Sequence, residues 1–212
     1  MHSEYSVTDG IVRIDDAVAR AKADGMPALA LTDAGNVFGM VKFYKAARAA
    51  GVKPVIGVDC WIQNRTDREK PYRALLLCAS RAGYLRLSEL LSRAWLTNQH
   101  RARAEIAMDW FREQGTGGLI ALSGFAGGDV AHALAGGNAA AAAKLAADWA
   151  KLFPGRYYLE VQRAGAPNTE QLVGGTLALA AKLRLPAADP RPGPTGMPWR
   201  FAQLMKSATI RK

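Results

Sequence analysis

Two short apolar runs, separated by a helical pattern, mark the centre of the chain. The runs cover residues 28–31 and 55–58, and each is soon followed by an aspartate, Asp33 or Asp59. Apolar runs of this length on either side of a helix predict a β–α–β unit with two parallel strands. Because functional groups in parallel α/β folds gather where strands end, we expect Asp33 and Asp59 to lie near a site.

The helix predicted over residues 36–50 carries an apolar stripe that we expect to face the core. Its members are Phe38, Val41, Phe43, Tyr44 and Ala47. Lys42, Lys45 and Arg48 are expected to stay in solvent. Gly51 is predicted to end the helix in a left-handed conformation, with Pro54 shortly beyond it.

The same alternation continues along the chain. Further helices are predicted over residues 14–23, 84–96, 106–112, 130–135, 139–152 and 169–183, and further strands over 74–79, 118–123, 157–161 and from 184 onward. Residues 97–104 are expected to form a basic, polar connection, and residues 124–128 a glycine-rich turn. Five or six successive strand–helix units predict an α/β fold with a parallel sheet or barrel.

Composition narrows the possible partners. The chain has 212 residues, of which 50% are hydrophobic, and a formal net charge of +10. Residues 187–212 hold five basic residues and one acidic residue, whereas the other charges are scattered along predicted helix faces. This distribution predicts weak affinity for nucleic acid without a dedicated groove.

The two cysteines indicate the redox environment. Cys60 and Cys78 both lie in apolar, strand-like runs, so we expect them to be buried and unpaired. The N-terminal stretch has no signal-peptide pattern, and no segment is apolar enough to span a membrane. Together these features predict a cytoplasmic protein with no membrane partner.

Several other motifs have ordinary structural explanations. The glycine-rich turn before Asp129 lacks the lysine of a P-loop, so we expect only a tight turn there. Ser123 has no nucleophile-elbow context. Trp149 and Tyr157 are expected in the core, and His100 and His132 are not expected to bind metal.

Five separate stretches, in order and with matching spacing, resemble one known family. They cover residues 2–10, 32–59, 83–96, 121–138 and 152–165. The resemblance is to the N-terminal PHP domain (polymerase and histidinol phosphatase) of the bacterial DNA polymerase III alpha subunit, of the proteobacterial replicative type. It implies an α/β fold, a distorted (βα)7 PHP-type barrel. We expect the barrel to occupy residues 1–186 and to be incomplete at both ends, and residues 187–212 to form a basic, proline-rich tail outside the family frame.

The resemblance also implies where a metal centre would lie. Active members hold two or three metal ions between imidazoles and carboxylates at the strand ends, and the ions activate water and bind a phosphoryl group. His2 matches the second histidine of a His-x-His motif, Asp9 matches a carboxylate ligand, and Asp59 stands where the family has a glutamate. These three residues are the vestigial ligands that we expect to remain.

Three further ligand positions are degenerate. Ala34 replaces the histidine of a Thr-Asp-His-x-Asn motif, Arg73 replaces a histidine that opens the next strand, and Phe125 replaces a cysteine. The family's final Asp-x-His motif is not recognisable near residues 191–193. We therefore expect no tightly bound cofactor and no catalytic residue, and at most one zinc, manganese or magnesium ion held weakly.

The resemblance implies a structural role in DNA replication. The expected partners are the remainder of the polymerase alpha subunit, the proofreading exonuclease (epsilon) subunit and, indirectly through the holoenzyme, DNA. Nucleotidyl transfer would need magnesium in a palm domain that this sequence lacks, so the fragment is expected to be inactive alone. Uncovered strand edges would make it marginally stable when expressed alone.

Two alternatives remain open. One is a metal-dependent phosphoesterase or pyrophosphatase of the PHP superfamily, and the other is a basic nucleic-acid-binding module. The first predicts hydrolysis with added manganese or zinc, and the second predicts binding that weakens steeply with salt.

Overall fold

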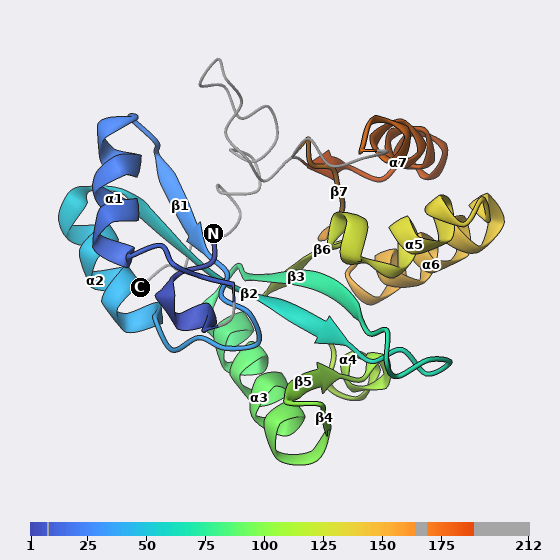
Figure 1. The fold of residues 1–212 in the computed structure, drawn as a ribbon, viewed down its shortest axis with the longest axis horizontal. Coiled ribbons are helices and arrows are strands. Elements are labelled where there is room, and N and C mark those ends of the chain that lie inside the picture. Colours follow the sequence, from blue (N-terminus) through green and yellow to red (C-terminus); the bar gives the residue numbers. More distant parts are fainter. Residues whose placement is uncertain (8, 164–168, 189–212) are drawn as a thin grey trace.

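The computed structural model describes residues 1–7, 9–163 and 169–188 (Figure 1). The helices are α1 (Ile14–Ala23), α2 (Met40–Ala50), α3 (Arg81–Thr97), α4 (Met108–Gln114), α5 (Asp129–Ala135), α6 (Ala139–Leu152) and α7 (Thr169–Leu183). The strands are β1 (Ala28–Leu31), β2 (Lys53–Ile62), β3 (Tyr72–Cys78), β4 (Gln99–His100), β5 (Arg103–Ile106), β6 (Leu119–Leu122), β7 (Tyr157–Glu160) and β8 (Ala187–Ala188). Short 3-10 helices cover η1 (Glu4–Ser6) and η2 (Phe125–Gly127).

The predicted β1–α2–β2 unit is confirmed. β1 pairs parallel with β2, from Ala28 opposite Lys53 to Leu31 opposite Ile56. Gly51 ends α2 with a left-handed φ of 78°, as the helix-end signal predicts. The helix begins at Met40 rather than at residue 36, because the Asn36 side chain accepts a hydrogen bond from the Phe38 backbone and holds this segment in a turn.

The predicted apolar stripe of α2 is only partly right. Phe43 and Ala47 are fully buried, whereas Phe38, Val41 and Tyr44 are exposed. At 3.6 residues per turn, Val41 lies about 160° around the helix from Phe43, so one face cannot contain both. α2 therefore has a buried apolar row and a second apolar row in solvent.

The sheet is mixed, and the prediction of an all-parallel arrangement is wrong. Its strand order is β4-β5-β2-β3-β6-β7-β8, with β1 also pairing with β2. β3 runs antiparallel to both β2 and β6. Residues 63–71, which join β2 to β3, are too few for the helical crossover that a parallel pair needs. Within the described residues β1 and β8 do not pair, so the sheet is open, as a distorted barrel allows.

The basic connection predicted over residues 97–104 is instead a small β-hairpin. β4 and β5 pair antiparallel, and Arg101 and Ala102 at the turn both have positive φ. Two successive residues with positive φ give the turn twist that joins adjacent antiparallel strands. His100, expected in a loop, lies in β4 and hydrogen-bonds Glu69.

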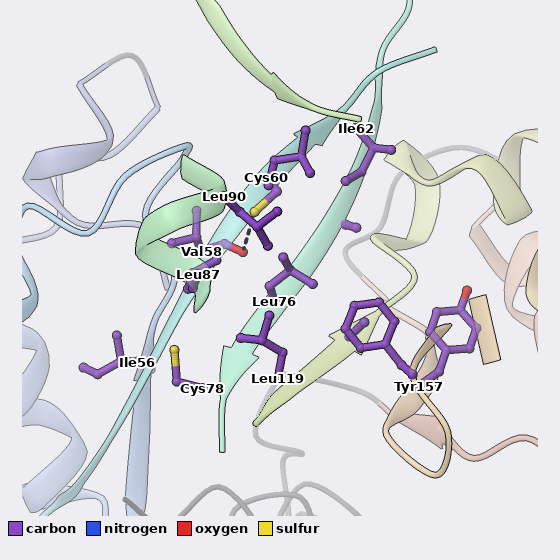
Figure 2. Packing of buried hydrophobic residues seen from close by; sticks show 14 of the residues in the cluster. Ile56, Val58, Cys60, Ile62, Leu76, Cys78, Leu87, Leu90, Leu119 and Tyr157 are labelled. Carbon is purple, nitrogen blue, oxygen red and sulfur yellow. Dashed lines mark hydrogen bonds between the residues drawn. The ribbon is translucent and has the colours of Figure 1, made fainter. Parts of the chain in front are cut away.

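α1 packs beside α2 at one end of the sheet and α5 packs beside α6 and α7 at the other, whereas α3 lies against the strands between them (Figure 1). The main core lies between sheet and helices, and Figure 2 shows Leu87 and Leu90 of α3 among side chains of β2 and β3. Cys60 and Cys78 are buried free thiols, as predicted. A smaller cluster, including Val55, Leu77 and Ile120, occupies another part of the interior. In the part of the chain that is described, no helix is long and apolar enough to cross a membrane.

Candidate functional site

The site lies where β1 ends beside the middle of β2. Beyond β1, Ala34 forms an isolated parallel bridge with Asp59. The Asp59 backbone N–H donates to the Asp33 backbone carbonyl at 3.1 Å, and the Gly35 backbone N–H donates to the Asp59 backbone carbonyl at 2.9 Å. These bonds hold Asp33 and Asp59 on adjacent backbones, as expected from the sequence, although Asp59 lies within β2 and not at its end.

Arg73 of β3 binds the Asp59 side chain through two contacts. Its Nε donates to Oδ1 at 3.0 Å and its Nη2 donates to Oδ2 at 2.5 Å. In the antiparallel register Arg73 lies opposite Trp61, which is two residues along β2 from Asp59. Arg73 and Asp59 are therefore diagonal neighbours on the same face of the sheet. The guanidinium also lies 4.9 Å from the centre of the Trp61 ring, close enough for a cation–π interaction.

His2 connects the same carboxylate to the N-terminal loop. Its Nε2 lies 3.3 Å from Asp59 Oδ2, and its Nδ1 lies 3.0 Å from Asp9 Oδ1. The hydrogen bond to Asp59, helped by the charge of Asp9, raises the pKa of His2 although burial opposes the rise. The three predicted vestigial ligands, His2, Asp9 and Asp59, are therefore brought together.

The charge balance at Asp59 favours its ionised form. Burial raises the pKa of Asp59, but the hydrogen bonds from His2 and Arg73 outweigh burial, so the pKa lies below its ordinary value. For Arg73, burial lowers the pKa, but the bond to Asp59 outweighs it and the pKa is raised. Asp59 is thus a carboxylate held between a fixed cation and an imidazole.

Asp33 is almost fully buried and has several hydrogen-bond donors. Its oxygens accept from the Ser3 backbone N–H at 2.6 Å, from Ser3 Oγ at 2.9 Å and from Ser6 Oγ at 2.8 Å. The Ser6 hydroxyl also accepts from the Ala34 backbone N–H at 3.1 Å. Asp33 therefore anchors the N-terminal segment on the end of β1.

The other degenerate positions have structural surroundings. Ala34 offers only its backbone, and Phe125 is buried against Val161 and Val173. Asp129 accepts from the Trp149 indole N–H at 2.9 Å and from the Val130 backbone at 2.7 Å, and burial raises its pKa. The predicted core positions of Trp149 and Tyr157 are confirmed by their stacked rings, 5.8 Å apart.

One acidic residue at this end of the sheet was missed in the sequence. Glu160, at the end of β7, is 3% exposed, and its backbone N–H donates to Ser123 Oγ at 2.9 Å. Its charge also raises the pKa of Arg73, but by less than Asp59 does. The signal that could have identified it is the one used for Asp33 and Asp59, an acidic residue at the end of an apolar strand.

The donor set does not fit a polynuclear metal centre. In the described part of the chain, no group of three or more histidine, cysteine, aspartate or glutamate side chains is placed to hold a metal ion. Asp59 is bound by Arg73, Asp33 is bound by two serines, and Ala34 has no ligating atom. This geometry suits an ion-paired strand end better than a site that activates water.

Comparison with known families gives a match to the model of the PHP domain over residues 1–164. The chain belongs to the PHP domain family. The chain is 42% identical over 186 residues to DNA polymerase III subunit alpha of Pseudomonas fluorescens, and the match covers 88% of this chain and 16% of that protein. It is 43% identical to the subunit alpha of a Neisseria meningitidis serogroup A strain, and that match covers 91% of this chain and 17% of the relative. It is 39% identical to the subunit alpha of Escherichia coli K12, and that match covers 88% of this chain and 16% of the relative.

The chain thus spans about a sixth of the length of these curated relatives. Among solved structures, it resembles a proposed metal-dependent phosphoesterase from Bifidobacterium adolescentis, with a TM-score of 0.51 and 11% identity. That match covers 96% of this chain and 93% of the other. At this identity it supports the PHP fold alone, and the resemblance to polymerase alpha subunits is carried by the sequence relatives.

Proposed function

We propose that this chain acts in DNA replication as the PHP domain of a DNA polymerase III alpha subunit, with a structural role in place of metal-dependent hydrolysis. The observation that carries the proposal is the two-contact pair between Arg73 and Asp59. A guanidinium on this carboxylate supplies, within the chain, the positive charge that a metal ion would otherwise bring. His2, Asp9 and Asp59 are on this account vestigial ligands that hold at most one divalent ion weakly.

The proposal includes the partners of such a domain. It would pack against the remainder of the alpha subunit and dock the proofreading exonuclease subunit, and it would reach DNA only through the assembled polymerase in the cytoplasm. Support comes from the relatives, each of which is a DNA polymerase III subunit alpha about six times as long as the matched region. Residues 187–188 add a short strand to the sheet, and the proposed basic tail otherwise lies outside the described residues.

A chimera tests this function. The matched region of the Pseudomonas fluorescens alpha subunit would be replaced by this chain, and primer extension would be measured with magnesium and dNTPs. We expect extension comparable to that of the parent subunit, and no extension by the 212-residue chain alone. An inactive chimera that is folded by circular dichroism would contradict the proposal.

The hydrolase alternative is tested on the chain by itself. With manganese or zinc added, we expect no hydrolysis of p-nitrophenyl phosphate or pyrophosphate above the blank. Metal-dependent hydrolysis that disappears when His2→Ala and Asp59→Ala are combined would replace the structural proposal with the phosphoesterase. Salt-sensitive binding of single-stranded DNA by the isolated chain would instead support the nucleic-acid-binding module.

A further inference from the structure

An apolar row on the outer side of α2 is not used by the fold. Phe38 is 71% exposed, Val41 56% and Tyr44 43%. They are spaced three residues apart, so their side chains lie on successive turns and form a continuous row, with Phe38 in the turn before the helix. Single exposed apolar residues are ordinary, but a row of three including two aromatic rings is typical of a contact surface.

Two cations adjoin this row. Lys45 follows Val41 by four residues and Arg48 follows Tyr44 by four, so each lies beside a member of the row. Neither forms an ion pair with another of the residues that the structure describes, whereas Lys42 on the same helix pairs with Glu4 and Asp15. We name Phe38, Val41, Tyr44, Lys45 and Arg48 the α2 patch.

The end of α3 contacts the loop that leads to the α2 patch. The Trp95 indole N–H donates to the Gly35 carbonyl at 2.9 Å, which fixes the carboxyl end of α3 against the loop that leads to Phe38. Trp95 is itself 38% exposed. A third exposed aromatic residue, after Phe38 and Tyr44, is therefore held by a hydrogen bond to the loop that precedes the α2 patch.

We propose that the α2 patch docks the polymerase portion of a DNA polymerase III alpha subunit, through a segment that presents apolar and acidic side chains. This inference rests on the proposed function. The relatives continue for about five-sixths of their length beyond the region that this chain matches, and a domain in such a protein buries part of its surface against the rest. Lys45 and Arg48, which form no ion pair within the described part of the chain, favour acidic partners, and the aromatic residues supply the apolar area.

The chimera described above provides the test. A photo-reactive benzoylphenylalanine would replace Tyr44 of the α2 patch, and in a matched control it would replace Leu177, which is also 43% exposed but lies on α7. After irradiation, mass spectrometry of the digested protein identifies the crosslinked peptides. We expect position 44 to crosslink to a peptide of the polymerase portion, with a yield about tenfold above that of position 177, and Val41→Asp to abolish this crosslink.

The outcomes separate the docking surface from the function. A chimera that extends primers but crosslinks from position 44 only within the PHP domain, or no more than from position 177, overturns the docking proposal and leaves the function standing. Crosslinking of position 44 to added exonuclease subunit instead would also overturn it, since the occupant is then a different protein. A folded chimera that extends no primers overturns the proposed function and with it the assigned occupant.

A second measurement guards against a folding artefact. In the isolated chain, Val41→Asp is expected to leave the thermal unfolding midpoint unchanged, as is Leu85→Asp at a position of similar exposure, 58%. In the chimera, only Val41→Asp should lower primer extension. Equal effects of both substitutions in the chimera would contradict a specific role of the α2 patch.

Discussion

The Arg73 guanidinium binds both carboxylate oxygens of Asp59, with Nε 3.0 Å from Oδ1 and Nη2 2.5 Å from Oδ2. In the same place, His2 links Asp59 to Asp9. The side chains that the sequence resemblance associates with metal ligands therefore bind other side chains of the protein. The pair joins β2 to β3 and fixes the N-terminal loop through His2.

Replacing Arg73 should destabilise the fold. Arg73→Ala leaves the Asp59 carboxylate half-buried and without its cation, and we expect a loss of about 2 kcal/mol in the free energy of unfolding, less than for a fully buried pair because both side chains are partly exposed. Urea denaturation monitored by tryptophan fluorescence measures it. Arg73→Lys, which keeps the charge but not the two-contact geometry, should lose less.

Arg20→Ala serves as the control for this series. Arg20 pairs with Asp24 on the surface of α1, where its side chain is 79% exposed, so its removal should leave the unfolding midpoint unchanged. An equal loss for Arg20→Ala and Arg73→Ala would mean that the Arg73–Asp59 pair has no special role in stability.

His2 should make stability depend on pH. Its pKa in the folded state is raised above 6.5 by Asp59 and Asp9, so the protonated imidazole stabilises the fold below pH 6.5 and this contribution is lost as pH rises through the folded-state pKa. The difference in unfolding free energy between the parent and His2→Gln should be larger at pH 6 than at pH 8.5. A difference that is constant, or that grows with pH, contradicts this arrangement.

The same titration can be observed directly. In a proton NMR titration the imidazole signals of His2 should have a midpoint above 6.5, and Asp59→Asn should bring the midpoint down, because Asp59 makes the largest contribution to the shift. An unchanged midpoint in Asp59→Asn would show that the imidazole does not contact this carboxylate in solution.

Asp33 should be the most sensitive carboxylate at the site. Asp33→Ala leaves the Ser3 and Ser6 donors without their buried acceptor, and we expect a loss of about 3 kcal/mol in unfolding free energy. Hydrogen exchange of the residue 3–6 amides should accelerate in the variant. Asp16→Ala, at an exposed position in the first turn of α1, should leave those amides protected.

Gly124 positions the backbone that carries Arg73. It has φ of 72°, and a Cβ there would lie 2.3 Å from the Arg73 carbonyl oxygen. Gly137 has a similar φ of 71° with open space around its Cβ position, so Gly137→Ala measures the conformational cost alone. We expect Gly124→Ala to lose about 2 kcal/mol more than Gly137→Ala in urea denaturation, because the Cβ overlaps backbone that cannot move freely.

The sequence predicted much of the local structure and less of the connections. α1, α6 and α7 have the predicted bounds because each has a regular helical apolar period. The direction of β3 was wrong because apolar runs carry no sign of strand direction, and only the length of the 63–71 link distinguishes a hairpin from a crossover. The sequence pattern predicts Phe38, Val41 and Tyr44 in the core because these residue types are the same as those of a buried helix face.

At the site, the sequence identified positions but not their pairing. His2, Asp9 and Asp59 were predicted together by resemblance, and the structure brings them together. The Arg73 contact depends on the β2–β3 register, which apolar patterning leaves open, so the sequence identifies Arg73 only as the replacement of a family histidine. Glu160 falls within the strand predicted over residues 157–161, and apolar patterning alone does not assign its charge to a site.

The number of metal ions per folded chain tests the central claim most directly. The purified 212-residue protein would be incubated with zinc and manganese, passed through a desalting column and measured by inductively coupled plasma mass spectrometry. If Arg73 has taken the place of the metal cluster, fewer than one ion per chain should remain. Two or more ions retained per chain would contradict the account and favour a hydrolytic centre.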